Sequence, residues 1–180
     1  MRIISGEWRG RKLLAPKNDA TRPTADRTRE TLFSMLASRL GSFEGLHVAD
    51  LFAGSGALGI EALSRGAAHC LFAEQDRDAL DALKQNLAAI GATPRADVRA
   101  GSVLALGPAK RTYDLLLLDA PYATGAGSVA LDKLDRLGWI GPDSLISVET
   151  AEKERVEVAG FAIDAERKVG KAKLTLLRRA

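Results

Sequence analysis

Four consecutive leucines, Leu115–Leu118, lie in the segment "YDLLLLDAPY" and set the strongest constraint on the fold. Successive side chains of a β-strand point to opposite faces of the sheet, so an unbroken apolar run requires burial on both faces. Strands of this kind occur in parallel sheets that helices cover on both sides. The run therefore predicts a strand within an α/β fold.

Strand-like and helix-like segments alternate from residue 46 onward, as such a sheet requires. Strands are expected at 46–52, 68–74, 96–102, 113–120 and 145–150, and helices at 56–66, 76–91 and 128–138. Asp76 is placed to cap the second helix and Gly91 to end it. Two closing antiparallel strands are expected within 154–180, on either side of a polar segment at 164–168.

The first 40 residues carry a different pattern. The segment "RIISGEWRGRKLLAP" alternates weakly and is broken by two glycines, which favours a short basic hairpin. A helix is expected from Asp26 to Leu40, with Thr24 or Asp26 as its cap and Gly41 at its end. Its apolar face carries Leu32, Leu36 and Leu40, and its other face carries Arg27, Arg29 and Arg39. We expect residues 1–180 to form a single domain, with residues 1–40 appended to its core.

The composition is that of a soluble globular protein, with 46% hydrophobic residues in a chain of 180. The sequence has no apolar run of about eighteen residues and no apolar block of a signal peptide, so a cytoplasmic location is expected. Cys70, the single cysteine, excludes an intrachain disulfide and is expected to be a small core residue. Together with His47 and His69 it gives no metal-ligand spacing, so no metal is expected.

Charge is distributed unevenly along the chain. Residues 1–40 carry a net charge of +5, residues 41–164 carry −7 and residues 165–180 carry +5, which together give the formal net charge of +3. An acidic middle between two basic ends is expected if the ends contact a polyanion. The alternative is that the basic ends are solvated tails.

Three glycines, Gly54, Gly56 and Gly59, follow a predicted strand in the G-x-G-x-x-G spacing. In an open α/β sheet, ligands bind beyond the carboxyl ends of the strands, so the loop from Phe52 to Ala57 is the expected binding site. Glycines there allow a positive φ and close approach of a ligand to the backbone. The spacing alone also fits a tight strand-to-helix turn that binds nothing.

Asp50 helps to decide which ligand such a loop would hold. A dinucleotide places its pyrophosphate at the N-terminus of the next helix, where a nearby carboxylate would repel it by on the order of several kcal/mol. S-adenosylmethionine (SAM) instead carries a sulfonium and an ammonium group, which the Asp50 carboxylate would attract. Glu74, at the end of the second strand, suits the ribose of either ligand. These residues favour SAM over a nicotinamide cofactor, and an oxidoreductase is the less favoured alternative.

The segment "DAPY" follows the leucine strand and so lies at the same edge of the sheet as the glycine loop. The Asp119 carboxylate and the carbonyl of Ala120 can accept hydrogen bonds from the exocyclic amine of a base, while Tyr122 can stack on its ring. Accepting these bonds turns the nitrogen lone pair toward the methyl group, so catalysis is mainly alignment and electrostatics. A strand-ending turn fixed by Pro121 is the alternative reading of this segment.

These motifs resemble those of a known family. The segments "MRIISGEWRGRKL", "RPTADRTRETLF", "DLFAGSGALGIEALSRGA" and "DAPY" are similar, in this order, to segments of the bacterial methyltransferases that modify the exocyclic N2 amine of one guanine in 16S ribosomal RNA. The resemblance runs from Met1 to about Arg179. It implies a Rossmann-like class I methyltransferase fold, whose seven-stranded, mostly parallel sheet has its last strand antiparallel. It also implies SAM as methyl donor and 16S ribosomal RNA, within the small subunit or its assembly intermediate, as substrate.

The resemblance implies roles for individual residues. Asp119, Ala120, Pro121 and Tyr122 would address the target base. The residues that would bind the donor are Asp50, Phe52, Ala53, Gly54, Gly56, Glu74, Gln75 and Ser102. Two of these positions depart from the usual pattern: Ala120 replaces the first proline of Asp-Pro-Pro, and Ser102 replaces an acid that accepts a bond from the adenine amine. Ala120 precedes a proline and so keeps an extended backbone, whereas a serine hydroxyl accepts more weakly than a carboxylate.

The basic ends are expected to contact RNA phosphates, which position a nucleic acid without reading its sequence. The residues expected to do so are Arg9, Arg11, Lys12, Arg22, Arg27, Arg29 and Lys171, together with Lys168 and Lys173. Trp8 either stacks on a base or packs the hairpin against the domain. The target guanine must leave its stack to be modified, and we expect a monomer that recognises a folded ribosomal surface.

Two other functions stay open at this point. The D-x-P-Y signature belongs to amine methylation generally, so methylation of the adenine N6 amine in DNA is one alternative. The departure at Ala120 makes a noncatalytic RNA-binding assembly factor the other.

Overall fold

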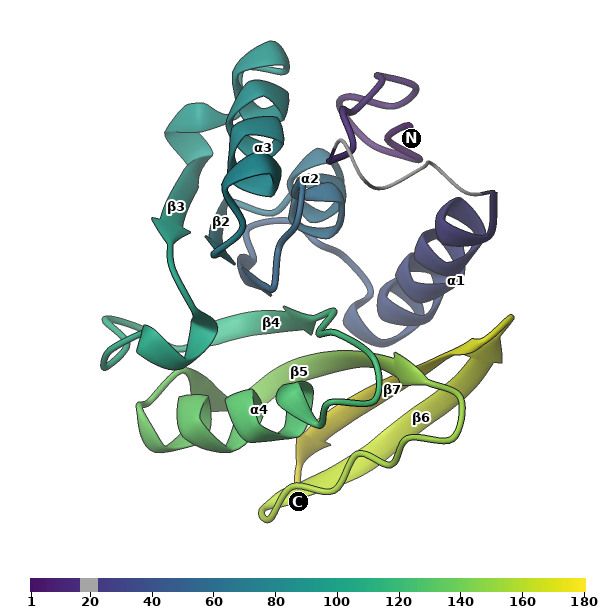
Figure 1. Cartoon of the computed structure of the whole chain (residues 1–180), viewed down its shortest axis with the longest axis vertical. Helices are drawn as coiled ribbons and strands as arrows, with labels where there is room; N and C mark the ends of the chain where they lie inside the picture. The colour runs from purple at the N-terminus through teal and green to yellow at the C-terminus, as the bar shows by residue number, and fades with distance from the viewer. Residues whose placement is uncertain (17–22) are drawn as a thin grey trace.

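The computed structural model describes residues 1–16 and 23–180, and these residues form a seven-stranded sheet with helices on both faces (Figure 1). The strands are β1 (His47–Leu51), β2 (His69–Glu74), β3 (Ala96–Ala100), β4 (Tyr113–Leu118), β5 (Ile140–Ala151), β6 (Phe161–Val169) and β7 (Ala172–Arg179). Their order is β3-β2-β1-β4-β5-β7-β6. Strands β1 to β5 pair in parallel, and β7 runs antiparallel to both of its neighbours. The predicted α/β sheet with an antiparallel last strand is confirmed.

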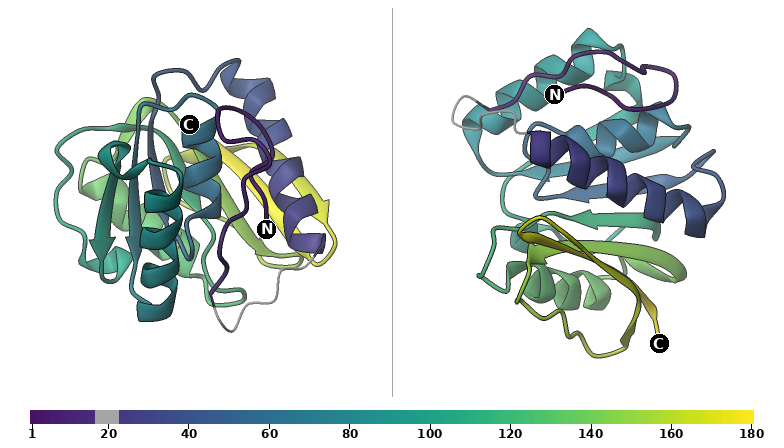
Figure 2. Two further views of the ribbon diagram at one scale, coloured as in Figure 1. Left: turned by 90° about the horizontal axis from the view of Figure 1, so that it is seen from above. Right: turned by 90° about the vertical axis from the view of Figure 1, so that its right-hand side faces the viewer.

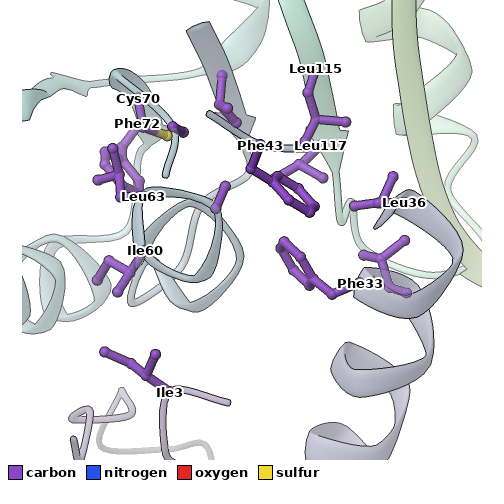
Figure 3. Packing of buried hydrophobic residues seen from close by; sticks show 14 of the residues in the cluster. Ile3, Phe33, Leu36, Phe43, Ile60, Leu63, Cys70, Phe72, Leu115 and Leu117 are labelled. Atoms are coloured by element: carbon purple, nitrogen blue, oxygen red, sulfur yellow. The ribbon is translucent and has the colours of Figure 1, made fainter. Parts of the chain in front are cut away.

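The leucine strand β4 lies between β1 and β5 and is buried on both faces, as its sequence predicts. Leu115 and Leu117 point into the core on one face, where they pack with Phe33, Leu36 and Phe43 (Figure 3). Leu116 and Leu118 point into the core on the other face. Helices α1 to α3 cover the first of these faces and α4 covers the second.

Helices α2 (Ala57–Ser64), α3 (Arg77–Ala89) and α4 (Ala126–Arg136) lie within the predicted ranges or begin just before them. Asp76 caps α3 by accepting a hydrogen bond of 2.9 Å from the backbone N–H of Ala79, which confirms its predicted role. Two short 3-10 helices, 93–95 and 103–105, precede β3 and β4.

Helix α1 (Pro23–Leu40) begins three residues before the predicted start. Asp26 therefore lies within the first turn and forms an ion pair with Arg29 at 3.5 Å, rather than capping the helix. A carboxylate is favourable in either position because both lie near the positive end of the helix dipole, so the residue type could not fix the boundary. The predicted end is confirmed, since Gly41 has a positive φ of 73°.

The N-terminal segment, residues 1–16, folds back on itself with one antiparallel bridge between Arg2 and Lys12 in place of regular hairpin strands. It runs over α2 and α3 (Figure 2). The backbone N–H of Trp8 donates to Ser64 Oγ at 3.0 Å, and the Trp8 side chain is buried. Gly6 approaches α2 so closely that a Cβ there would lie 1.9 Å from the carbonyl oxygen of Ser64. Trp8 thus packs this segment against the domain.

The predicted position of the last turn is wrong. The polar segment at 164–168 lies inside β6, and the chain turns at Gly170 and Lys171 instead. Strand β6 is an edge strand with mostly exposed side chains, so polar residues suit it and do not mark a turn. Asp164 within it pairs with Arg39 of α1 at 2.8 Å.

Cys70 is buried in β2, as expected of a core residue. Within residues 1–16 and 23–180, no helix has the length and apolar character needed to cross a membrane.

Replacing Gly59 with alanine should destabilise the fold. The added Cβ would lie 2.4 Å from Cε1 of Phe72 and 2.7 Å from Sγ of Cys70, so α2 would have to move away from β2. We expect Gly59→Ala to lower the free energy of unfolding by about 1–3 kcal/mol in urea denaturation. The control is Gly107→Ala, because a Cβ there meets nothing within 4 Å. Equal stability of the two variants would contradict the close contact between α2 and β2.

Candidate active site

A cavity of about 630 Å³ opens at the carboxyl ends of β1, β2, β4 and β5. Eight residues expected at the site line it: Phe52, Glu74, Gln75, Ser102, Asp119, Ala120, Pro121 and Tyr122. Both predicted loops therefore face one space. Five lining residues were not expected there: Ala25, Ala73, Gly101, Val103 and Glu149. Glu149 could have been identified from the sequence, because it lies near the carboxyl end of the strand predicted at 145–150. Ala25 carries no such signal.

The glycine loop is held in shape by its backbone and by Glu74. Phe52, Gly54 and Gly56 have positive φ values of 63°, 59° and 89°. Such a φ is unusual for phenylalanine, and strained residues of this kind cluster at functional sites. Glu74 accepts a 2.7 Å hydrogen bond from the N–H of Gly54 with one carboxylate oxygen, and bonds from the N–H groups of Gln75 and Asp76 with the other. The acid expected at the ribose also fixes the loop.

Three other residues of the glycine loop were also expected to bind the donor. Ala53, Gly54 and Gly56 do not line the cavity in this structure. A Cβ on Gly56 would lie 2.3 Å from Cδ1 of Leu83, so Gly56, like Gly59, is required for close contact between neighbouring elements. The glycine spacing thus serves the fold of the loop as well as any ligand.

Asp50 occupies a different position from the one expected. It is 1% exposed, does not line the cavity, and accepts a 2.9 Å hydrogen bond from the N–H of Gly59 in α2. Burial raises the pKa of Asp50 to about 8, and the bond from Gly59 opposes this shift. The Asp50 side chain points into the interior, so the structure does not support the predicted attraction between its carboxylate and a cationic ligand. Instead, Asp50 ties β1 to the first turn of α2.

The loop after β4 forms the side of the cavity that was expected to face a base. Asp119 and Tyr122 are exposed, while Ala120 is buried. The hydroxyl of Tyr122 donates to Glu149 of β5. Burial and this bond raise the pKa of Tyr122, so the phenol keeps its proton. The Thr124 hydroxyl donates to the carbonyl of Pro121 at 2.7 Å and braces the loop from within.

Ser102 lies on the wall of the cavity, at the position expected to face an adenine. Its side chain caps the short helix that follows by accepting a 3.2 Å hydrogen bond from the N–H of Leu104. A hydroxyl has two lone pairs and one proton. Ser102 can therefore cap this turn and still meet a ligand.

The structure separates the predicted RNA-binding residues into exposed and buried ones. Arg9, Arg11, Lys12, Arg27, Lys168 and Lys171 are exposed. Arg11 donates to the carbonyl of Ala89 at 2.8 Å, and Lys168 pairs with Glu152 at 3.2 Å. Arg22 lies outside the described residues.

Arg29 and Lys173 are corrections to the predicted RNA surface. Arg29 is 5% exposed, and its guanidinium donates to the carbonyl of Arg2 and lies 4.0 Å from Glu61. Lys173 is 8% exposed and donates to the carbonyl of Glu154. Both side chains are buried and bind groups of the protein, so neither is available to contact an RNA phosphate. Sequence alone did not show which basic residues face inward.

Across the described part of the chain, no three His, Cys, Asp or Glu side chains are grouped so as to hold a metal ion. The polar side chains that line the cavity fall into two groups instead. Glu74 and Ser102 suit hydroxyl and amine donors on one side, and Asp119 and Tyr122 suit a planar base on the other.

The sheet order and the cavity at its strand ends are those of Rossmann-like class I methyltransferases. The solved structure of yhhF from Escherichia coli has a TM-score of 0.84 and 37% identity, covering 99% of this chain and 97% of its own. That of HI0767 from Haemophilus influenzae has a TM-score of 0.81 and 32% identity, covering 99% and 97%. A magnesium protoporphyrin IX methyltransferase from Synechocystis with bound SAM shares the fold at a TM-score of 0.67 and 16% identity, covering 91% and 87%.

The sequence comparison narrows this class to a family. The family model described as Conserved hypothetical protein 95 matches residues 1–178. Ribosomal RNA small subunit methyltransferase D of Escherichia coli K12 is 36% identical over 99% of this chain and 90% of its own length. The protein of the same name from Haemophilus influenzae is 39% identical over 86% and 80%. The chain belongs to this family, which confirms the predicted membership of a bacterial 16S ribosomal RNA methyltransferase family.

The raised pKa of Asp50 predicts how stability depends on pH. The folded protein holds this proton more tightly than the unfolded chain does, so the contribution to stability is complete below about pH 4 and is lost as the pH rises through about 8. Asp50→Asn keeps an acceptor for Gly59 but has no proton to lose. Between about pH 5 and about pH 8.5, we expect the free energy of unfolding of the wild type to fall more than that of Asp50→Asn, by on the order of a few kcal/mol.

Urea denaturation of both proteins at the two pH values measures this difference. Other titrating groups are common to the two proteins and cancel in the comparison. Parallel pH profiles would show that Asp50 titrates normally in the folded protein.

Proposed function

We propose that this protein is a monomeric, single-domain enzyme that transfers a methyl group from SAM to the N2 amine of a guanine in 16S ribosomal RNA. The observation that carries the proposal is that Glu74 and the Asp119–Tyr122 segment line the same cavity. Membership of a family that includes ribosomal RNA small subunit methyltransferase D supports ribosomal RNA as the substrate.

The donor side of the cavity fits SAM. The Glu74 carboxylate already accepts three backbone bonds, and of its about four acceptor positions one stays, on the oxygen bound to Gly54, for a ribose hydroxyl. Phe52 and Val103 supply apolar surface for the adenine, and Ser102 supplies a hydroxyl near it. When bound, SAM supplies an electrophilic methyl group on its sulfonium.

The base side of the cavity then orients the nucleophile. The Asp119 carboxylate and the Ala120 carbonyl accept hydrogen bonds from the two amine protons, and this directs the nitrogen lone pair toward the donor. Tyr122 keeps its proton and stacks on the ring. Asp119 would stabilise the positive charge that develops on the nitrogen as the N–C bond forms and the bond from methyl to sulfonium breaks, which leaves a neutral thioether. The charged nitrogen is acidic and would lose its surplus proton to water, so no strong general base is needed.

Methyl transfer to small ribosomal subunits from cells lacking this protein tests the proposal. With labelled SAM, the wild type should give N2-methylguanosine after RNA digestion and mass spectrometry. Asp119→Ala should lower the rate by roughly 100-fold, because it removes one acceptor and the charge that stabilises the transition state. The control is Asp143→Ala, an exposed acid in β5 outside the cavity lining. Label recovered as N6-methyladenosine, or no transfer at all, would contradict guanine N2 methylation.

Exposed cations of the N-terminal segment should strengthen binding to the subunit. Replacing both Arg9 and Lys12 with alanine removes two charges that face solvent. We expect roughly tenfold weaker binding at low salt. The slope of log K against the logarithm of the salt concentration should also become shallower, by about one unit for each lost phosphate contact. The control is Arg136→Ala in α4, at the opposite end of the molecule from the N-terminal segment (Figure 1). Filter binding at several salt concentrations measures both quantities, and an equal loss in the control would indicate a nonspecific charge effect.

A further inference from the structure

The cavity carries a second acid beside Asp119. Strands β4 and β5 pair in parallel with Leu118 opposite Val148, so Asp119 and Glu149 each follow the last of these paired residues. Both acids line the cavity. The function proposed above uses Asp119 and leaves Glu149 without a direct role.

Glu149 is positioned by Tyr122. One of its carboxylate oxygens accepts the bond from the Tyr122 hydroxyl, and its side chain is half-buried. A carboxylate has two oxygens and about four acceptor positions. The bond from Tyr122 therefore fixes the direction of the Glu149 carboxylate while leaving it able to accept from a ligand. The same bond fixes the ring expected to stack on the base.

Asp119 and Ala120 cannot by themselves distinguish guanine from adenine, because both bases carry an exocyclic amine. The two bases differ at the adjacent ring atom, N1. In guanine N1 carries a hydrogen and is a donor, whereas in adenine N1 has a lone pair and is an acceptor. A carboxylate next to the bound amine would attract the first and repel the second.

We infer that Glu149 is a specificity-determining residue that accepts a hydrogen bond from guanine N1–H. This inference rests on the proposed function, and it places the N2 amine at Asp119 and the neighbouring N1–H toward the adjacent strand. A base with a lone pair at N1 is rejected because two acceptors would face each other in a partly desolvated site. Glu149 thus supplies the choice of base that the "DAPY" segment lacks.

The test replaces the target guanosine, once mapped by product analysis, with 2-aminopurine riboside in reconstituted small subunits. 2-Aminopurine keeps the amine at position 2 but has a lone pair at N1. The wild type should methylate guanine over 2-aminopurine by roughly 100-fold in kcat/KM. In Glu149→Gln the amide NH₂ can donate to that lone pair, so the preference should shrink by at least about tenfold. 2-Aminopurine also lacks O6, but this loss is the same for both enzymes and cancels between them.

Tyr122→Phe is the matched variant, because it removes the hydroxyl bound to Glu149 and keeps the ring. Its preference for guanine should fall by less than that of Glu149→Gln, because the Glu149 carboxylate loses the bond that orients it but keeps its charge. The inference is overturned if Glu149→Gln slows both substrates equally, or if Tyr122→Phe changes the preference as much as Glu149→Gln does. If the wild type transfers no methyl to guanine-containing subunits, the proposed function itself fails and this inference fails with it.

Discussion

The parallel pairing of β1 with β4 is the constraint on which the site depends. Val48–Leu51 lie beside Leu115–Leu118, so the loops that follow these strands must open at the same edge of the sheet. The strand order reverses at this point, and the diverging connections leave a crevice there. The leucine run requires β4 to be covered on both faces, and this burial places the segment "DAPY" beside the glycine loop.

Three acids around the site hold backbone N–H groups in place, and one of them, Glu74, also faces the cavity. Glu74 holds the glycine loop through the N–H of Gly54, and Asp50 holds the first turn of α2 through the N–H of Gly59. Glu61 of α2 is 1% exposed and accepts bonds from the N–H groups of Ile4 and Ser5, which anchors the N-terminal segment to the helix that follows the loop. The basic residues that we propose as RNA contacts lie in this anchored segment.

Most of the fold could be predicted from the sequence because its parallel strands are apolar and its helices have clear ends. The turn between β6 and β7 was misplaced because an exposed edge strand tolerates the same polar residues as a turn. For the site, residues at the end of a strand or directly after it, such as Glu74 and Asp119, were placed correctly at the cavity. Side-chain direction was not predictable, since Asp50 turns inward to the N–H of Gly59 in the next helix, and Arg29 turns inward to Glu61, which is distant in the sequence. Ala25 lines the cavity only because the tertiary fold brings it there, which no local sequence pattern could predict.

The central claim is that one cavity has a donor side at Glu74 and a base side at Asp119. Titration calorimetry of SAM with the wild type, Glu74→Ala and Asp119→Ala tests it most directly, with thermal unfolding to confirm that each variant is folded. We expect Glu74→Ala to raise the Kd for SAM by about tenfold or more, because it removes acceptors for the ribose and frees the glycine loop. Asp119→Ala should leave the Kd within about twofold of the wild type. Equal Kd values for folded Glu74→Ala and wild type, or loss of SAM binding in Asp119→Ala, would contradict this division of the cavity.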